Sequence, residues 1–174
     1  TDRREWVDTD TIVGEIRNWL EVNDTPDYIT LTGSGEPTLN SGIGRIISAI
    51  HQMCSVPVAV LTNGALLHRP DVRQDILDAD LVVPSLDASN DREMRSVNRN
   101  HPALSFDMLV DGLRAFADEY DNQVWLEVLL IAGVTDNEDS VGRIARLAER
   151  INHDRIQLNT VVRPPAVPGT RAVP

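Results

Sequence analysis

The amino-acid sequence predicts an α/β protein in which parallel strands alternate with helices. Short runs rich in Val, Ile and Leu alternate with segments of helical periodicity, which is the pattern of parallel strands covered by helices. Each apolar run is nearly continuous, as expected when both faces of a strand are covered. Polar residues follow the runs directly, at the strand ends where ligands bind in barrels and open sheets alike. We therefore expect a barrel or an open sheet with one ligand-binding mouth.

The composition fits one ordinary soluble domain. The chain has 174 residues, of which 41% are hydrophobic, and a formal charge of −11. Its only cysteine, Cys54, excludes an intrachain disulfide and a zinc site built from cysteines. The amino terminus is charged and no apolar run is long enough to cross a membrane, so a cytoplasmic location is expected. All 16 basic residues are arginine, and the net negative charge disfavours direct nucleic-acid binding.

Strands and helices are expected in alternation. The strands are expected at residues 28–32, 58–62, 81–85, 124–131 and 155–161. A first helix at residues 11–22 precedes them, with an apolar stripe that includes Ile12 and Ile16, and with Thr9 or Asp10 as its cap. A second helix at residues 41–53 buries a stripe of isoleucines.

Four further helices separate the later strands. Pro70 is expected to open the third helix, because its fixed φ and missing N–H suit a first helical turn. A short helix is expected at residues 91–97. The clearest helical pattern follows Ser105, and Asp107 there suits the positive end of the helix dipole. The last helix is expected at residues 140–151.

The carboxyl-terminal tail differs in composition from the rest of the chain. Its last twelve residues, RPPAVPGTRAVP, contain four prolines and predict an extended or ragged segment. No internal repeat and no linker interrupts the preceding residues. We therefore expect residues 1–165 to form one domain and residues 166–174 to form a proline-rich tail.

The strongest local signal is a glycine loop, LTGSGEP at residues 31–37, that directly follows the first strand. Gly33 and Gly35 allow positive φ and let a ligand approach free backbone N–H and C=O groups. Pro37 keeps Glu36 out of the helical region, so its carboxylate is presented from a stiffened backbone. We expect this loop to receive an amine; the alternative is a tight turn with a solvated Glu36. The loop matches neither the GxGxxG pattern nor a P-loop.

Two further polar segments follow the next two strands. Thr62 ends the second strand, and Asn63 with the following glycine marks a turn with positive φ. Ser85 and Asp87 share one face at the end of the third strand, where they could accept a ribose diol or cap the next helix. Pro84 removes a donor from the strand ladder, so a bulge or another irregularity is expected there.

Glu127 is unusual because it lies among the apolar residues of the fourth strand. It must pair with an arginine, accept hydrogen bonds or face a wet cavity, and a structural ion pair and a cavity-lining role are both open. Asn98, Arg99 and His101 form a polar cluster after the short helix, for which ordinary loop chemistry is the simpler interpretation. The other histidines have no metal-binding spacing, and Cys54 fits a small core residue.

In this order the segments resemble the radical S-adenosylmethionine (SAM) superfamily, and within it the iron-sulfur oxidoreductases related to the wyosine-forming tRNA enzymes. The resemblance covers residues 4–165. Its most specific pieces are GSGEPTLN at 33–40, AVLTNG at 59–64, ADLVVPSLDA at 79–88, WLEVLLIAGVTDN at 125–137 and QLNTVVRPP at 157–165. Five matches in the right order argue against chance.

The resemblance implies a partial barrel with the chemistry inside its mouth. Gly33, Ser34, Gly35 and Glu36 match the superfamily's GGEP loop, which receives the methionyl amine of SAM, although Ser34 departs from that pattern. The cofactor is thus implied to bind where the first predicted strand ends.

The resemblance implies further cofactor contacts at the ends of the later strands. Thr62 and Asn63 match polar positions that line the cofactor pocket, and Ser85 and Asp87 fall where the family places its ribose contacts. Three residues are implied near the adenine site: Leu130, Ile131 and Asn159.

One departure from the superfamily is large. The family's CxxxCxxC motif follows its first strand and supplies three thiolates to a 4Fe-4S cluster, whereas this chain has one cysteine in an unrelated place. Five strands are predicted here where the family barrel has six. The fold class that we expect is therefore a partial (β/α) barrel of the radical SAM type that lacks the first strand and the cluster loop. No catalytic residue and no metal ligand is expected within this chain.

The resemblance implies that the complete protein cleaves SAM with a 4Fe-4S cluster and releases a 5′-deoxyadenosyl radical that takes hydrogen from a substrate. This chain alone is then expected to be inactive. Two alternatives stay open. One is a degenerate SAM-binding domain without catalysis, and the other is an iron-independent barrel enzyme with Glu36 or Glu127 as general base.

The implied partners follow from the same resemblance. An electron donor such as a ferredoxin or a flavodoxin is expected, and no membrane partner is expected. The substrate is open; tRNA is disfavoured by the charge of −11. Loss of a first strand leaves one edge of the strand at residues 28–32 unpaired, which predicts self-association through that edge.

Overall fold

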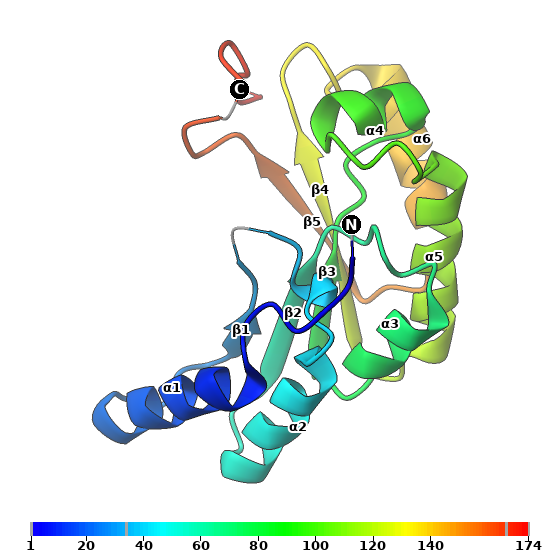
Figure 1. The fold of residues 1–174 in the computed structure, drawn as a ribbon. Coiled ribbons are helices and arrows are strands. Elements are labelled where there is room, and N and C mark those ends of the chain that lie inside the picture. The colour runs from blue at the N-terminus through cyan, green and yellow to red at the C-terminus, as the bar shows by residue number, and fades with distance from the viewer. Residues whose placement is uncertain (1, 34, 166, 174) are drawn as a thin grey trace.

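The computed structural model describes residues 2–33, 35–165 and 167–173, which form one sheet with helices along it (Figure 1). The strands are β1 Ile29–Leu31, β2 Val58–Thr62, β3 Leu81–Pro84, β4 Gln123–Leu130 and β5 Arg155–Thr160. The helices are α1 Thr9–Val22, α2 Ile43–Met53, α3 Pro70–Ile76, α4 Asp91–Val97, α5 Phe106–Glu119 and α6 Glu138–Ala148, and a 3-10 helix, η1, spans Pro37–Leu39. Each strand and helix that the sequence predicts is present in the predicted order, whereas η1 was not predicted.

All five strands are parallel and follow the order β1-β2-β3-β4-β5, so each strand pairs with its neighbour in the sequence. Parallel neighbours need crossover connections, and here the crossovers pass through the helices. The carboxyl ends of the strands consequently lie along one edge of the sheet. We call this edge the mouth.

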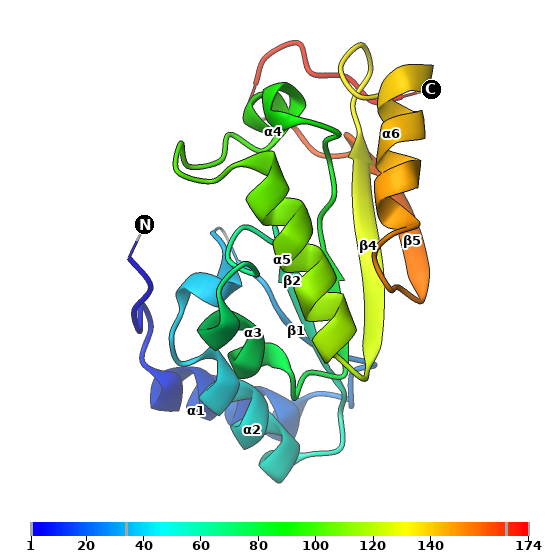
Figure 2. The same ribbon diagram turned by 90° about the vertical axis from the view of Figure 1, so that its right-hand side faces the viewer.

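The helices cover one face of the sheet, which we call the outer face. Turned by 90°, the molecule shows α3 and α5 in front of the strands (Figure 2). Alternate side chains such as Val60, Val82 and Leu126 point into this layer and are fully buried with Phe116 of α5. Each such side chain contributes roughly 1.5–3 kcal/mol through its burial. This layer is the main core and holds the strand ends in place.

The opposite, inner face carries a smaller apolar cluster. Ala59, Leu81 and Val83 form it, and Leu61 and Trp125 pack against it. Their positions alternate with those of the outer face, because successive side chains of a strand point to opposite sides. In the described part of the chain the helices cover the outer face alone.

The prediction that both faces of every strand are covered is therefore wrong. The inner face is closed in part by its own apolar side chains, and in the described part of the chain no helix covers the outer face of β5. Ile156 and Leu158 there are 41% and 66% exposed. An apolar run of strand length thus marks burial of the central strands but not of this last one.

The helix boundaries depart slightly from the predicted ones. Asp8 caps α1, since its Oδ2 accepts a hydrogen bond from Thr11 N at 2.9 Å; the caps expected from the sequence were Thr9 or Asp10. Asn137 caps α6, which begins and ends earlier than predicted. These shifts follow from side-chain caps that satisfy the free N–H groups of a first helical turn.

Pro84 interrupts the strand ladder without producing a bulge. Val82 lies opposite Val124, and Ser85 forms a bridge with Glu127, so the register between β3 and β4 is continuous across the proline. The irregularity that the sequence predicts is thus a gap in the hydrogen bonding. It brings Ser85 and the residues after it to the mouth in register with β4.

The carboxyl-terminal tail folds back over the ends of β4 and β5. Ala132 N donates a hydrogen bond to Arg171 O at 3.1 Å, and Val173 N donates one to Thr160 Oγ1 at 2.8 Å. Of the two expectations for the tail, extended or ragged, the ragged one is therefore wrong for residues 167–173. Across the described residues, no helix combines the length and the apolar character that crossing a membrane requires.

Candidate functional site

Glu36 ties the loop after β1 to the end of β2. Its Oε1 accepts hydrogen bonds from Thr38 N at 3.1 Å, from Thr38 Oγ1 at 2.6 Å and from Thr62 Oγ1 at 2.6 Å. Its Oε2 accepts one from Asn63 N at 2.8 Å. The interpretation of Glu36 as a solvated side chain is therefore wrong. Four donors, three of them on Oε1, occupy most of the acceptor capacity of this carboxylate, so they also compete with any role as a general base.

The glycine loop is open on one side. Both glycines are able to adopt a positive φ, a freedom that the backbone does not use at Gly33. Among the described residues, a Cβ placed on Gly35 would meet no heavy atom within 4 Å, which leaves space for a ligand against the backbone. Ser34, also expected in this site, lies outside the described residues. After β2, Gly64 has φ of 71°, which confirms the predicted turn.

Asp87 is the most buried acid at the mouth. It is 8% exposed, and its Oδ1 accepts a hydrogen bond from Leu129 N at 2.9 Å while its Oδ2 accepts one from Asn98 Nδ2 at 2.8 Å. Burial raises the pKa of Asp87 to about 6; the two hydrogen bonds oppose the shift, and the nearby charge of Glu127 adds to it. Asp87 therefore changes its charge close to neutral pH.

Glu127 lies on the inner face beside Ser85 and accepts a hydrogen bond from Asn159 Nδ2. Its partner is thus an amide, and no arginine lies within 4.0 Å of it among the described residues. The structural ion pair that the sequence left open is therefore wrong. Ser85, Glu127 and Asn159 instead form a polar group on β3, β4 and β5 where these strands reach the mouth.

The end of β4 is closed by Thr135, which is fully buried. Ile131 N donates a hydrogen bond to Thr135 Oγ1 at 3.0 Å, and Thr135 Oγ1 donates one to Leu129 O at 3.3 Å. The carbonyl oxygen of Leu130 accepts a hydrogen bond from Thr160 Oγ1 at 3.1 Å. These bonds fix the backbone at Leu130 and Ile131. The side chains of both residues are apolar, so they offer a ligand no hydrogen bond.

Helix α4 is fixed to α6 through Glu93. Its Oε2 accepts hydrogen bonds from Ser89 N at 2.8 Å and Ser89 Oγ at 2.7 Å, and its Oε1 accepts them from Ser140 Oγ at 2.6 Å and Arg143 at 3.2 Å. Burial alone would raise the pKa of Glu93, but the hydrogen bonds outweigh it and lower the pKa to about 2. Glu93 therefore stays ionised and holds α4, and with α4 Asn98, over Asp87.

A cavity of about 360 Å³ opens between η1, the loop after β2 and the segment that joins α4 to α5. Glu36 and Asn63 form one side of it, so the cavity borders the hydrogen-bonded group that Glu36 forms at the ends of β1 and β2. Asn98, Arg99 and His101, for which ordinary loop chemistry was the simpler interpretation, line its other side. The volume falls within the usual range for small-molecule sites.

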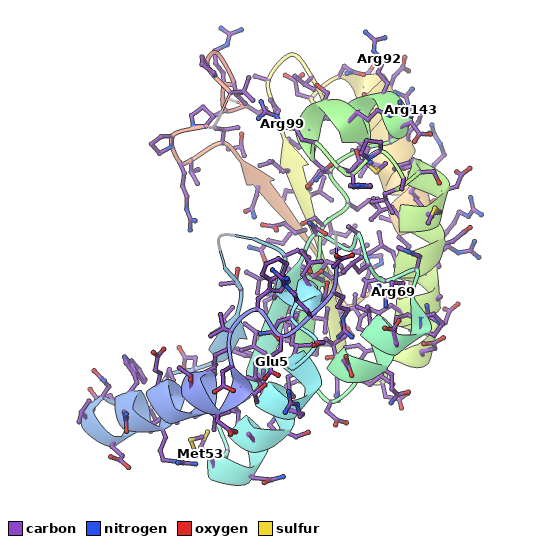
Figure 3. All side chains as sticks on the ribbon, in the orientation of Figure 1. Glu5, Met53, Arg69, Arg92, Arg99 and Arg143 are labelled. Atoms are coloured by element: carbon purple, nitrogen blue, oxygen red, sulfur yellow. The ribbon has the colours of Figure 1, made fainter. Side chains whose placement is uncertain are left out.

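The segment after α4 has an unfavourable backbone and an unpaired polar atom. Arg99 has φ of 49°, a left-handed conformation that costs a non-glycine residue about 1 kcal/mol. Asn100 Nδ2 donates hydrogen bonds to the carbonyl oxygens of His101 and Leu104 at 3.2 and 2.9 Å, while its Oδ1 is buried without a partner among the described residues. Such costs concentrate at functional sites. Figure 3 places Arg99 and Arg92 at opposite ends of α4.

One contributor to this site, Glu93, was missed at the sequence level, and the role of another, Asn98, was not found. Asn98 was noted, but its bond to Asp87 depends on how α4 packs over β3, which no local pattern reveals. Glu93 carries a detectable signal, because Asn90 and Glu93 have the spacing of a capping box, and Asn90 Oδ1 indeed accepts from Glu93 N at 3.0 Å.

With fold and site described, comparisons with known proteins identify the class. Residues 1–148 match the family described as the Radical SAM superfamily. Because this match covers most of the chain, the chain belongs to the radical SAM superfamily. The narrower resemblance to the wyosine-related oxidoreductases stays a prediction.

Curated relatives extend beyond the region that this chain represents. A "GTPase Obg" of Brachyspira hyodysenteriae is 37% identical over 163 residues, which are 94% of this chain and 24% of that protein. A "UPF0026 protein" of Methanocaldococcus jannaschii is 30% identical over 95% of this chain and 52% of its own length, and one of Helicobacter pylori is 33% identical over 92% and 52%. The chain thus spans about a quarter to a half of these relatives.

Solved structures confirm the fold. A domain of pyruvate-formate lyase-activating enzyme from Bacteroides vulgatus superposes with a TM-score of 0.62 at 17% identity, covering 84% of each chain. A radical SAM methyltransferase from Sphaerobacter thermophilus superposes with a TM-score of 0.66 at 24% identity, covering 92% of this chain and 48% of that one. The predicted α/β partial barrel of the radical SAM type is confirmed.

The superfamily generally uses SAM and a 4Fe-4S cluster, and this chain fits the two groups differently. Cys54 ends α2, where its Sγ lies 3.6 Å from Ile50 O, and no group of three or more His, Cys, Asp or Glu residues in the described part could hold a metal ion. These residues do not fit the cluster. The open backbone at Gly35 and the acceptor groups at the mouth do fit a ligand that carries an amine and hydroxyls.

Proposed function

We propose that this chain is the SAM-binding core of a radical SAM enzyme, an iron-sulfur oxidoreductase in its complete form. The observation that supports the proposal most directly is the arrangement of the mouth. An open glycine loop follows β1, and a buried acceptor, Asp87, follows β3 on the same edge of the sheet.

The amine of SAM is assigned to the loop of Gly33, Gly35 and Glu36. Backbone carbonyls of the glycine loop accept hydrogen bonds from an ammonium group, and Glu36 contributes negative charge while the protein's own donors hold it in place. Thr62 and Asn63 keep this carboxylate at the end of β2. Ser34 belongs to the proposal through the sequence match.

The ribose diol is assigned to Ser85 and Asp87, and the adenine to the ends of β4 and β5. Asp87 retains acceptor capacity beyond its two protein hydrogen bonds. Near the adenine we place three residues: Leu130, Ile131 and Asn159. Because the amide of Asn159 already donates to Glu127, its side-chain carbonyl is the group offered to an adenine amine.

Bound SAM would supply radical chemistry, because one-electron reduction cleaves its sulfur–carbon bond into methionine and a 5′-deoxyadenosyl radical that can take hydrogen from a substrate. This chain's part is to bind the cofactor, orient it and exclude water. The thiolates for the cluster do not come from this chain, so the proposal gives it no catalytic residue. A ferredoxin or a flavodoxin is the proposed electron donor, and the unpaired edge of β1 is the proposed surface for self-association.

Calorimetric titration of the 174-residue chain with SAM tests the proposal. Gly35→Val fills the open side of the loop, and we expect it to weaken SAM binding about ten-fold or more while leaving the melting temperature unchanged. Gly14→Val is the matched control, because a Cβ there also meets nothing within 4 Å but lies on α1. Absence of SAM binding, or equal binding by the two variants, would overturn the proposal.

A further inference from the structure

The cavity between η1, the loop after β2 and the segment after α4 has the composition of a binding site of its own. Its apolar wall includes six large side chains: Leu39, Leu66, Met94, Leu104, Met108 and Leu109. Small-molecule sites combine such a wall with a few fixed polar groups. Four polar side chains of this cavity have no assigned role in the cofactor site: His68, Arg99, Asn100 and His101.

The two histidines of the cavity present opposite hydrogen-bonding groups. The Nδ1 atom of His68 lies 3.0 Å from Ala65 O, and since a carbonyl only accepts, this Nδ1 carries the proton. Neutral His68 therefore offers Nε2 as an acceptor. In His101 the Nδ1 atom accepts from Ala103 N at 3.2 Å, so neutral His101 carries its proton on Nε2 and offers a donor.

Arg99 provides the positive charge of the cavity. No carboxylate lies within 4.0 Å of its guanidinium among the described residues. The other charged group in the wall, Glu36, already accepts four hydrogen bonds from the protein. Arg99 and the Nε2–H of His101 are thus free for an anionic group, whereas His68 is free for a hydroxyl or an amine.

We propose that this cavity binds the substrate, and that the substrate is a small organic acid with an apolar body and one further hydrogen-bond donor. The acid, a carboxylate or a phosphate monoester, binds Arg99 and His101, and the donor binds His68. This substrate role rests on the proposed function, because Glu36 and Asn63 belong both to the cavity wall and to the proposed SAM site. A ligand in the cavity therefore lies beside the bound cofactor.

Four model compounds test the chemistry on the 174-residue chain. They are 4-hydroxyphenylacetate, phenylacetate, phenyl phosphate and the neutral 2-(4-hydroxyphenyl)ethanol, and binding is measured by ligand-observed NMR and calorimetry. We expect the acids to bind more tightly than the neutral alcohol, and 4-hydroxyphenylacetate more tightly than phenylacetate. Whichever of phenylacetate and phenyl phosphate binds better identifies the acid. Equal binding of the acids and the alcohol would overturn the proposal.

Two variants locate the binding. Arg99→Gly suits the left-handed backbone at this position, and we expect it to weaken binding of the acids about ten-fold while leaving the alcohol unaffected. His68→Phe should remove the advantage of 4-hydroxyphenylacetate over phenylacetate. Arg92→Ala, at the other end of α4, is the control and should change neither (Figure 3). Unchanged acid binding by Arg99→Gly would contradict the assignment.

Titrations with SAM separate this inference from the proposed function. We expect SAM and 4-hydroxyphenylacetate to bind together, each with unchanged affinity when the other is present. If SAM binds but the acids do not, or if the two compete, the inference is wrong and the SAM site stands. If the acids bind but SAM does not, the proposed function is wrong and the substrate role falls with it.

Discussion

Two acids near the mouth, Glu93 and Asp87, are both held by hydrogen bonds, yet their pKa values move in opposite directions. Glu93 accepts four hydrogen bonds, two of them from serine hydroxyls and one from Arg143, and its pKa falls to about 2. Asp87 accepts two hydrogen bonds, lies deeper and has Glu127 nearby, and its pKa rises to about 6. Burial disfavours both charges, but it is greater at Asp87, where it outweighs two hydrogen bonds, than at Glu93, where four hydrogen bonds outweigh it.

The difference separates an acid that stabilises the fold from an acid that is available to a ligand. Every oxygen of Glu93 is satisfied by protein, and the group connects α4 to α6. Asp87 accepts fewer hydrogen bonds than a carboxylate can, and a bound hydroxyl would donate one more. A carboxylate that the protein leaves partly unsatisfied at the end of a strand is thus a sign of a binding site.

The largest effect is expected from Glu93→Ala. It leaves two serine hydroxyls and Arg143 without their shared acceptor, so the free energy of unfolding should fall by about 3 kcal/mol. For a chain of this length that lowers the melting temperature by about 10 °C. Thermal and urea unfolding measure the change, and Glu15→Ala, an exposed acid on α1, should shift neither. A loss as small as that of Glu15→Ala would remove the structural role assigned to Glu93.

Asp87→Asn should have the opposite effect on stability and a clear effect on binding. The neutral amide avoids the cost of the buried charge, so at pH 7 the free energy of unfolding should rise by about 1 kcal/mol. SAM affinity should fall about ten-fold, because a ribose hydroxyl loses an ionised acceptor. Asp154→Asn is the matched control: Asp154 Oδ2 accepts from Val124 N at 2.8 Å at the other end of β4. The SAM affinity of Asp154→Asn should be unchanged. Normal SAM binding by Asp87→Asn would contradict the ribose assignment.

Part of the contrast between Glu93 and Asp87 can be predicted from the sequence, and so can most of the fold. The apolar runs locate all five strands because burial of the outer face selects Val, Ile and Leu at positions such as Val60 and Val82. The same runs led to the wrong expectation of two covered faces. The capping-box spacing of Asn90 and Glu93 was available as a signal for the anchor of α4.

The site itself was harder to predict than the elements that carry it. Glu36, Asp87 and Asn159 were selected because they follow or end predicted strands, and the structure places all three at the mouth; their roles toward a cofactor stay predictions. Their partners could not be derived, because Asn98 meets Asp87 only after α4 packs over β3. The cavity beside Arg99 depends on a left-handed backbone at a non-glycine residue, for which the sequence carries no local signal.

Lowering the pH should change the contributions of Asp87 and Glu93 to the free energy of unfolding in different pH ranges. The pKa of Asp87 is higher in the folded protein than its ordinary 3.8, so its contribution to stability is complete below pH 3.8 and is lost as the pH rises through about 6. Between pH 7 and pH 5 the wild type should therefore gain about 1 kcal/mol relative to Asp87→Asn. Glu93 has a lowered pKa, so its contribution is complete above pH 4.5 and is lost as the pH falls toward about 2. Urea unfolding at stepped pH measures both, and identical profiles of wild type and Asp87→Asn between pH 7 and 5 would contradict the raised pKa.

Asn98→Ala should produce the smallest change in stability and the sharpest test of the comparison. Asn98 donates to Asp87 Oδ2 at 2.8 Å and thereby lowers a pKa that burial raises, so its removal should move the pKa of Asp87 further above 6. The free energy of unfolding should change by less than about 1 kcal/mol, because Asn98 itself is exposed. Carbon-13 NMR of the labelled Asp87 carboxyl group follows the titration directly. An upward shift of the Asp87 pKa would show that the hydrogen bond from Asn98 helps to set the charge of this acid. Glu93 keeps all of its donors in this variant, so the pKa of Glu93 should not move. A common shift of both pKa values would instead mean that α4 had moved as a whole.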